Sequence, residues 1–148
     1  MAYDVEIVDR QREDAAVVRG RVPQEGVGAF IGAAFPEVLA GLGGVPVTGP
    51  PFCKVDMDGD AFLLEVGFPV ERAIEPNGKV QPSRLSAGLV ATVVHVGSYE
   101  SVPAAYAYLE EWMGQNGYAP VGPPWETYLD GPEVAEPRTI VTWPVERQ

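Results

Sequence analysis

The sequence repeats a pattern of short segments, and this internal duplication limits the folds open to the chain more than any other feature. Three segments recur in the same order, displaced by 76, 73 and 75 residues: 16–18 (AVV) at 92–94 (TVV), 49–55 (GPPFCKV) at 122–128 (GPPWETY), and 68–70 (FPV) at 143–145 (WPV). One matching tripeptide would be noise, but three in order indicate two similar halves. A chain of 148 residues fits one domain built from such halves.

The first half, about residues 3–70, has the pattern of strand, helix, strand and strand. Apolar residues recur at helical spacing over 27–42, although Pro36 lies inside this segment and predicts a kink or a late start of the helix. Alternating apolar residues predict the strands, and Asp58-Gly59 is a hairpin turn signal. The expected elements are strands at 3–8, 15–22, 52–57 and 60–70 and a helix at 27–42.

The second half, about residues 87–148, repeats this order after a connecting loop predicted at 71–86, which is polar and contains two prolines. Ser101 is a candidate helix cap, and Gly117 is well placed to end the same helix. The expected elements are strands at 88–96, 125–129 and 138–145 and a helix at 102–115. We therefore predict an α+β fold with duplicated, SHS2-like β-α-β-β halves, pseudo-twofold symmetry, an antiparallel sheet, two helices and a central groove.

Charge and composition exclude several classes of function. The formal net charge is −11, with 21 acidic against 10 basic residues, which disfavours nucleic-acid binding and weakly favours cationic partners. One cysteine and one histidine leave no disulfide and no cysteine-based metal site, and no glycine motif for a nucleotide is present. The sequence has no apolar run of membrane-spanning length and no signal-peptide profile. We expect a cytoplasmic protein without cofactor, metal or membrane contact.

The duplicated halves differ at one chemically important position. Glu126 lies opposite Cys53 in the alignment of the two halves, and Trp125 lies opposite Phe52. The two-residue period of a strand places Glu126 and Tyr128 on one face and Trp125 on the other. Because an unpaired buried carboxylate is costly, a glutamate in so apolar a strand suggests a site. If the halves form a pocket, only one of them supplies a carboxylate.

The segment from residue 95 to residue 145, which contains HVGSYESVPAAYAYLEEWM, NGY, GPPWETYLDGP and WPV, resembles the GyrI-like superfamily. This superfamily includes the effector-binding domains of multidrug-sensing MerR- and AraC-type regulators. The resemblance implies two β-α-β-β units around a central ligand groove. It also implies that Glu126 is the family's motif glutamate, at the floor of an aromatic pocket that accepts lipophilic, often cationic, molecules.

The same resemblance leaves three functions open. The first is binding of a lipophilic, aromatic or cationic small molecule, by a stand-alone domain because the sequence shows no helix-turn-helix segment. The second is hydrolysis, since some stand-alone members open the strained ring of cyclopropanoid natural products; Glu126 and Tyr128 would then be catalytic. The third is inhibition of a protein partner, as in the gyrase-inhibitor protein, through the acidic surface.

Apart from Glu126 itself, the candidate ligand-binding residues are aromatic, or in the case of Cys53 lie opposite Glu126 in the alignment of the halves. For Trp112, Cys53, Trp143, Phe68 and Tyr106, packing in the core is the favoured interpretation, while for Tyr99 and Tyr128 core packing and ligand contact both stay open. The single histidine, His95, has the pattern of a structural residue, and because it aligns with Arg19 we expect it to reach solvent. The candidate ligand-binding set is Glu126, Tyr128, Trp143, Tyr106, Tyr99, Phe68, Cys53 and Trp112.

Overall fold

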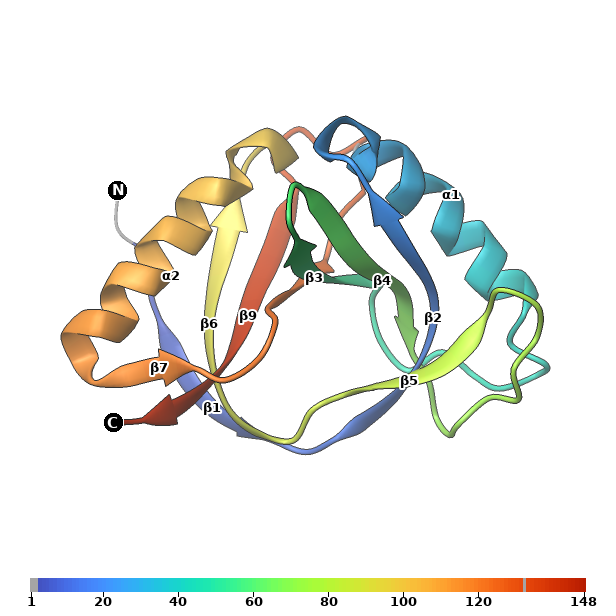
Figure 1. The fold of residues 1–148 in the computed structure, drawn as a ribbon, viewed down its shortest axis with the longest axis horizontal. Helices are drawn as coiled ribbons and strands as arrows, with labels where there is room; N and C mark the ends of the chain where they lie inside the picture. Colours follow the sequence, from blue (N-terminus) through green and yellow to red (C-terminus); the bar gives the residue numbers. More distant parts are fainter. Residues whose placement is uncertain (1–2, 132) are drawn as a thin grey trace. The chain divides into compact units, whose positions relative to one another are not determined.

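A computed structural model describes residues 3–131 and 133–148 of the chain (Figure 1). It confirms the α+β class, with two long helices and antiparallel strands. The chain forms two compact units. One unit contains the described residues up to Gln11 together with Ala87–Gln148, and the other contains Arg12–Ser86. Each unit combines one long helix with its own set of paired strands (Figure 1). The pseudo-twofold symmetry remains a prediction.

The Arg12–Ser86 unit pairs its strands in the order β3-β4-β2-β5, all antiparallel. Helix α1 contacts β2 and β4, and its own residues Ala34 and Val38 are buried. The helix runs through Pro36 without a break, so the late start that Pro36 suggested is wrong. The elements are β2 (Glu13–Val22), the 3₁₀ turn η1 (Gln24–Gly26), α1 (Val27–Ala40), β3 (Phe52–Asp58), β4 (Ala61–Pro69) and β5 (Gln81–Leu85).

Strand β5 corrects the prediction that residues 71–86 form only a connecting loop. It pairs with β2 from Gln81 opposite Val17 to Leu85 opposite Glu13. The segment is short and carries a proline, so its local pattern resembles a loop. Its pairing depends on contacts with a strand 64 to 72 residues earlier in the chain, which a local pattern does not reveal.

The other unit pairs its strands in the order β1-β6-β9-β8, again antiparallel, and β7 pairs with β9. Strand β1 joins the sheet through β6, with Glu6 opposite Thr92 and Arg10 opposite Gly88. The first strand of the sequence therefore completes the sheet of the second half. The elements are β1 (Glu6–Arg10), β6 (Gly88–Val96), the 3₁₀ turn η2 (Tyr99–Ser101), α2 (Val102–Asn116), β7 (Tyr118–Pro120), β8 (Trp125–Tyr128) and β9 (Arg138–Arg147).

Helix α2 buries one apolar stripe against β6 and β9. Ala105, Leu109 and Met113 are fully buried on this stripe and pack with Val93 and Val141 of the sheet. Their spacing of four residues is the periodicity that predicted the helix. This packing fixes the position of α2 over the sheet, and so fixes the side chains that α2 presents to β8.

The two ends of α2 are built differently from each other. Gly117 ends the helix in the left-handed conformation, with φ of 78°, as the sequence predicted. Ser101 precedes the helix, but its side chain makes no capping bond to the backbone of α2. Its hydroxyl instead donates to the carbonyl oxygen of Ser98 at 2.8 Å. Ser101 therefore occupies the N-cap position that the sequence predicted, without a capping bond from its side chain.

Candidate ligand site around Glu126

Strand β8 places Glu126 and Tyr128 side by side on one face. The Tyr128 hydroxyl donates to Oε1 of Glu126 at 3.0 Å, which confirms that the two side chains share a face. Trp125, on the other face, is buried, and the guanidinium of Arg10 lies 5.1 Å from the centre of its ring. The alternation of the strand therefore separates a carboxylate–phenol pair from a buried indole.

Helix α2 supplies the second hydrogen-bond donor to Glu126. The Tyr106 hydroxyl donates to Oε2 at 2.7 Å, so each carboxylate oxygen accepts one phenol hydroxyl. Tyr106 follows Ala105 and precedes Leu109, and the burial of these two residues holds this turn of the helix against the sheet. The sequence placed Tyr106 on the apolar face of the helix, but its hydroxyl bond to Glu126 is a finding of the structure.

Two further aromatic rings flank the phenol pair. Trp143 of β9 packs edge-on against Tyr106, with ring centres 5.9 Å apart, and Tyr99 packs edge-on against Tyr128 at the same separation. Trp143 shares its face with Glu126 because Val141, two residues earlier on β9, lies directly opposite Glu126. The structure thus brings five of the predicted site residues into one cluster: Glu126, Tyr128, Tyr106, Trp143 and Tyr99.

Burial dominates the electrostatics of Glu126. Loss of solvent raises the pKa of its carboxyl above the ordinary value, and the hydrogen bonds from Tyr106 and Tyr128 offset only part of this rise. Among residues 3–131 and 133–148, no lysine or arginine forms an ion pair with Glu126. The carboxylate is therefore satisfied by hydrogen bonds but has no countercharge within the described part of the chain.

Tyr99 has partners that the sequence did not predict. Its hydroxyl donates to the backbone oxygen of Asp130 at 2.7 Å, and the Asp130 carboxylate in turn accepts from Arg138. Burial, with the negative charges of Glu133 and Asp130, raises the pKa of the Tyr99 phenol. The hydrogen bonds from Arg138 lower the pKa of Asp130. Tyr99 thus faces the site with its ring while its hydroxyl is already bonded.

The remaining candidates have contacts of another kind. Trp112 stacks on Tyr118, with ring centres 5.6 Å apart and planes 17° from parallel. Phe68 packs edge-on against Phe35 in the Arg12–Ser86 unit, and Cys53 of that unit is fully buried. A contribution of these three residues to ligand binding remains a prediction.

His95 is buried, with 4% of its surface exposed, so the expectation that it reaches solvent is wrong. Its Nδ1 lies 2.9 Å from the Tyr3 hydroxyl, and its Nε2 lies 2.8 Å from Oγ of Ser101 and 3.3 Å from the Ser98 oxygen. The alignment with Arg19 misled because an arginine can extend to water where an imidazole is enclosed. His95 organises the turn that leads into α2, in agreement with the structural role that its position indicated.

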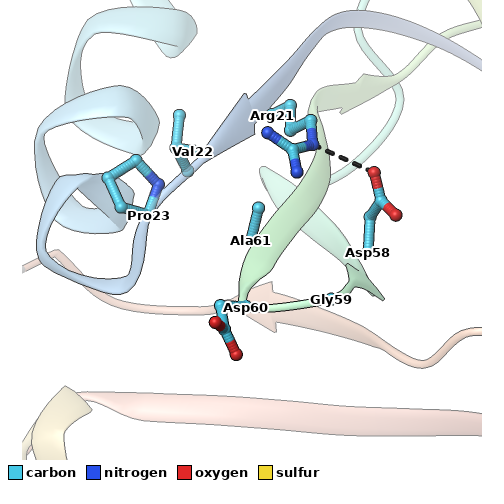
Figure 2. A pocket seen from close by; sticks show the side chains of 7 residues that line it. All are labelled: Arg21, Val22, Pro23, Asp58, Gly59, Asp60 and Ala61. Carbon is cyan, nitrogen blue, oxygen red and sulfur yellow. Dashed lines mark hydrogen bonds and ion pairs between the residues drawn. The ribbon is translucent and has the colours of Figure 1, made fainter.

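A separate cavity of about 410 Å³ lies beside the β3–β4 hairpin (Figure 2). Its charged lining residues are Arg21, Asp58 and Asp60. Nε of Arg21 donates to Asp58 at 3.0 Å. Since the ion pair with Asp58 already satisfies Arg21, the cavity offers less distinctive chemistry than the Glu126 cluster.

Within the part of the chain that the structure describes, no group of three or more His, Cys, Asp and Glu side chains could hold a metal ion. None of the described helices is long and apolar enough to span a membrane.

Comparison with known proteins places this geometry in a family. The model of the GyrI-like small-molecule-binding domain matches residues 3–146. No match was found among curated proteins. The crystal structure of the EcmrR C-terminal domain is similar over the full length of both chains, with 26% identity and a TM-score of 0.81.

Two more distant structures share the fold. A hydrolase from Listeria innocua has 17% identity and a TM-score of 0.67, covering 98% of this chain and 93% of its own. The protein SAV2435, solved bound to tetraphenylphosphonium, has 14% identity and a TM-score of 0.53, covering 99% and 94%. With the family model spanning nearly the whole sequence, the chain belongs to the family of GyrI-like small-molecule-binding domains.

Proposed function

We propose that this chain binds a lipophilic aromatic cation at Glu126, with Tyr106, Tyr128 and Trp143 as aromatic contacts. The observation that carries the proposal is a largely buried carboxylate that accepts two phenol hydroxyls and lacks a countercharge among the described residues. A bound cation would supply that charge. The aromatic rings would add cation–π attraction, which contributes about 0.5–2 kcal/mol for each well-placed ring.

The energetics of burial favour an organic cation over a small hydrated one. A hydrated ammonium or metal ion must lose much of its solvation in a partly apolar site, which is costly. A cation whose charge is spread beneath phenyl groups is weakly hydrated and buries apolar surface on binding. SAV2435 binds a molecule of this class, tetraphenylphosphonium, and that precedent supports the proposed chemistry.

The first experiment compares two ligands of similar shape and opposite charge. Isothermal titration calorimetry at neutral pH should show binding of tetraphenylphosphonium and much weaker binding of tetraphenylborate. Glu126→Gln should weaken the phosphonium complex by about tenfold or more, because its anion is removed. The control is Glu110→Gln, which makes the same change of charge at an exposed position of α2 and should leave affinity unchanged. Equal loss in both variants, or equal binding of both ligands, would contradict a site built on Glu126.

Hydrolysis of a strained electrophile is the second candidate, and the state of Glu126 favours it specifically. A carboxyl with a raised pKa beside two phenol hydroxyls suits general acid–base catalysis near neutral pH. In this function Glu126 takes the proton from water as the water oxygen attacks the ring carbon, and the strained ring carbon–carbon bond breaks. The released electron pair passes to a conjugated carbonyl oxygen of the substrate, and Tyr128 stabilises that oxygen by a hydrogen bond.

Mass spectrometry separates the two candidates. Cyclopropanoid electrophiles are incubated with the wild-type protein and with Glu126→Gln, and a product heavier by one water is sought. Product from the wild type alone, with substrate still bound by the variant, establishes the hydrolase. Binding without product establishes a binding protein. Absence of both binding and product would favour the third function, inhibition of a protein partner.

A further inference from the structure

The turn that carries Tyr99 is held by hydrogen bonds to the buried side chain of His95. His95, the buried residue that ends the inward face of β6, contacts Oγ of Ser101 at 2.8 Å and the carbonyl oxygen of Ser98 at 3.3 Å. Tyr99 lies between these two serines, at the start of η2. The imidazole therefore holds both ends of the short segment from which the Tyr99 side chain extends.

The far end of the Tyr99 side chain is fixed as well. Its hydroxyl donates at 2.7 Å to the backbone oxygen of Asp130, which follows β8 by two residues. Asp130 is itself held by Arg138, whose backbone nitrogen and Nε both donate to Oδ2, at 3.0 Å and 2.8 Å. A backbone hydrogen bond of 3.0 Å from Gly97 to Pro137 joins the same two loops. Tyr99 thus bridges the β6–α2 turn and the β8–β9 loop.

Between these two anchors, the ring of Tyr99 meets Tyr128 edge-on, at 5.9 Å and 85°. Tyr128 is the residue whose hydroxyl reaches Oε1 of Glu126. We propose that Tyr99 is a positioning residue of the Glu126 site: anchored on Asp130, it holds the ring of Tyr128 in the orientation that keeps the Tyr128 hydroxyl on the carboxylate. This assigns Tyr99 a role through Tyr128, in place of the direct ligand contact that the sequence suggested.

The inference rests on the proposed function only in giving the site a ligand, because the contacts that position Tyr128 all lie within the chain. A hydrogen bond from Tyr128 favours the ionised carboxylate, so any loosening of Tyr128 makes Glu126 easier to protonate. Loss of the Tyr99 ring would also admit water to the site, which acts in the opposite direction because it reduces desolvation. If Tyr99 acts by positioning Tyr128, its loss raises the pKa of Glu126. If it acts by excluding water, its loss lowers that pKa.

The test is a carbon-13 NMR titration of the Glu126 side-chain carboxyl in ligand-free protein, with the resonance assigned by its absence in Glu126→Gln. Tyr128→Phe should move the titration midpoint upward by about one pH unit, as loss of a hydrogen bond to a charged group predicts. Tyr99→Leu should move it upward by about half a unit, and Tyr99→Phe by less, since the ring is kept. Adding Tyr99→Leu to Tyr128→Phe should cause no further upward movement, because the two residues act through one hydrogen bond.

Tyr108→Phe is the matched control. Tyr108 is also a tyrosine of this unit that packs against another ring, that of Tyr3, and its substitution should leave the Glu126 titration unchanged. Folding of every variant is checked by far-ultraviolet circular dichroism. The proposal is overturned if the Tyr99 variants leave the midpoint unchanged or lower it. It is equally overturned if Tyr99→Leu raises the midpoint as much in the Tyr128→Phe background. Failure of tetraphenylphosphonium to bind would refute the proposed function without altering any of these titrations.

Discussion

A single carboxylate sets the chemistry of this domain at the scale of the residue. Glu126 lies in a strand that is otherwise apolar or aromatic, where an isolated charge would be costly. The structure resolves this cost with two phenol hydroxyls, one on each carboxylate oxygen, and without a cation from the described chain. Burial favours the protonated carboxyl and the two hydroxyls favour the anion, so a charged ligand can shift the balance between these states.

This state of Glu126 predicts how stability depends on pH. Its pKa in the folded protein lies above the value of 4.5 for an unperturbed glutamate, so the folded protein binds the proton more tightly than the unfolded chain. The resulting stabilisation is complete below pH 4.5 and is lost as pH rises through the folded pKa. Glutamine does not titrate. Glu126→Gln should therefore become increasingly more stable than wild type as pH rises above 4.5, reaching a plateau.

Urea denaturation from pH 4 to pH 8 measures this difference in the free energy of unfolding. Glu110→Gln, exposed on α2, serves as the control, and its difference from wild type should stay nearly constant over the same range. A Glu126→Gln curve that stays parallel to wild type throughout would show that burial does not perturb the carboxyl.

Trp112 of α2 and Trp143 of β9 should respond differently to substitution. Trp143 packs against Tyr106, which binds Glu126, whereas Trp112 stacks on Tyr118. Trp143→Leu should weaken tetraphenylphosphonium binding by about two- to thirtyfold, the equivalent of one cation–π contact. Trp112→Leu should change affinity by less than about twofold once both variants are confirmed to be folded. Fluorescence titration checks this, and a larger loss in Trp112→Leu would place the ligand elsewhere.

At the scale of the element, local pattern was sufficient where apolar and aromatic residues mark a segment and insufficient where few of them do. Both helices and the strands β2, β3, β4, β6, β8 and β9 were predicted within a few residues because their periodicity spans a whole face. Strands β5 and β7 were missed, since β5 (QPSRL) has Leu85 as its one large apolar residue and β7 (YAP) is only three residues long. Such strands exist because a distant partner offers hydrogen bonds, and no local pattern records that partner.

The C-terminal end of α2 offers a prediction with a built-in control. Gly117 has a φ of 78°, where a side chain is strained, while Gly114 is helical, and a Cβ at either position would meet open space. Gly117→Ala should therefore destabilise the protein by about 1 kcal/mol. Gly114→Ala should stabilise it by about 0.5–1 kcal/mol. Thermal denaturation of both variants measures the difference, and the same sign for both would contradict the assigned backbone conformations.

For the whole molecule, the duplication predicted the class of fold but not how the halves complete their sheets. Strand β1 belongs to the first repeat in sequence yet pairs with β6 of the second, and β5 pairs with β2 of the first. The sequence also showed that Glu126 and Tyr128 share a face. It could not show that Tyr106 reaches the same carboxylate or that Tyr99 is bonded to Asp130, because these contacts depend on how α2 and two loops dock.

The net charge of −11 acts on the molecule as a whole and should govern how quickly a cation arrives. Long-range attraction accelerates encounter, and salt screens it over a Debye length of about 10 Å at 0.1 M ionic strength. Raising salt from about 0.01 M to 0.3 M should therefore slow association of tetraphenylphosphonium severalfold and leave its dissociation nearly unchanged. Glu126→Gln should keep this salt dependence, because it alters one charge among many, while dissociating faster. Stopped-flow fluorescence separates the two rates. Should salt instead change mainly the dissociation rate, charges close to the bound ligand, and not the field of the whole protein, would govern recognition.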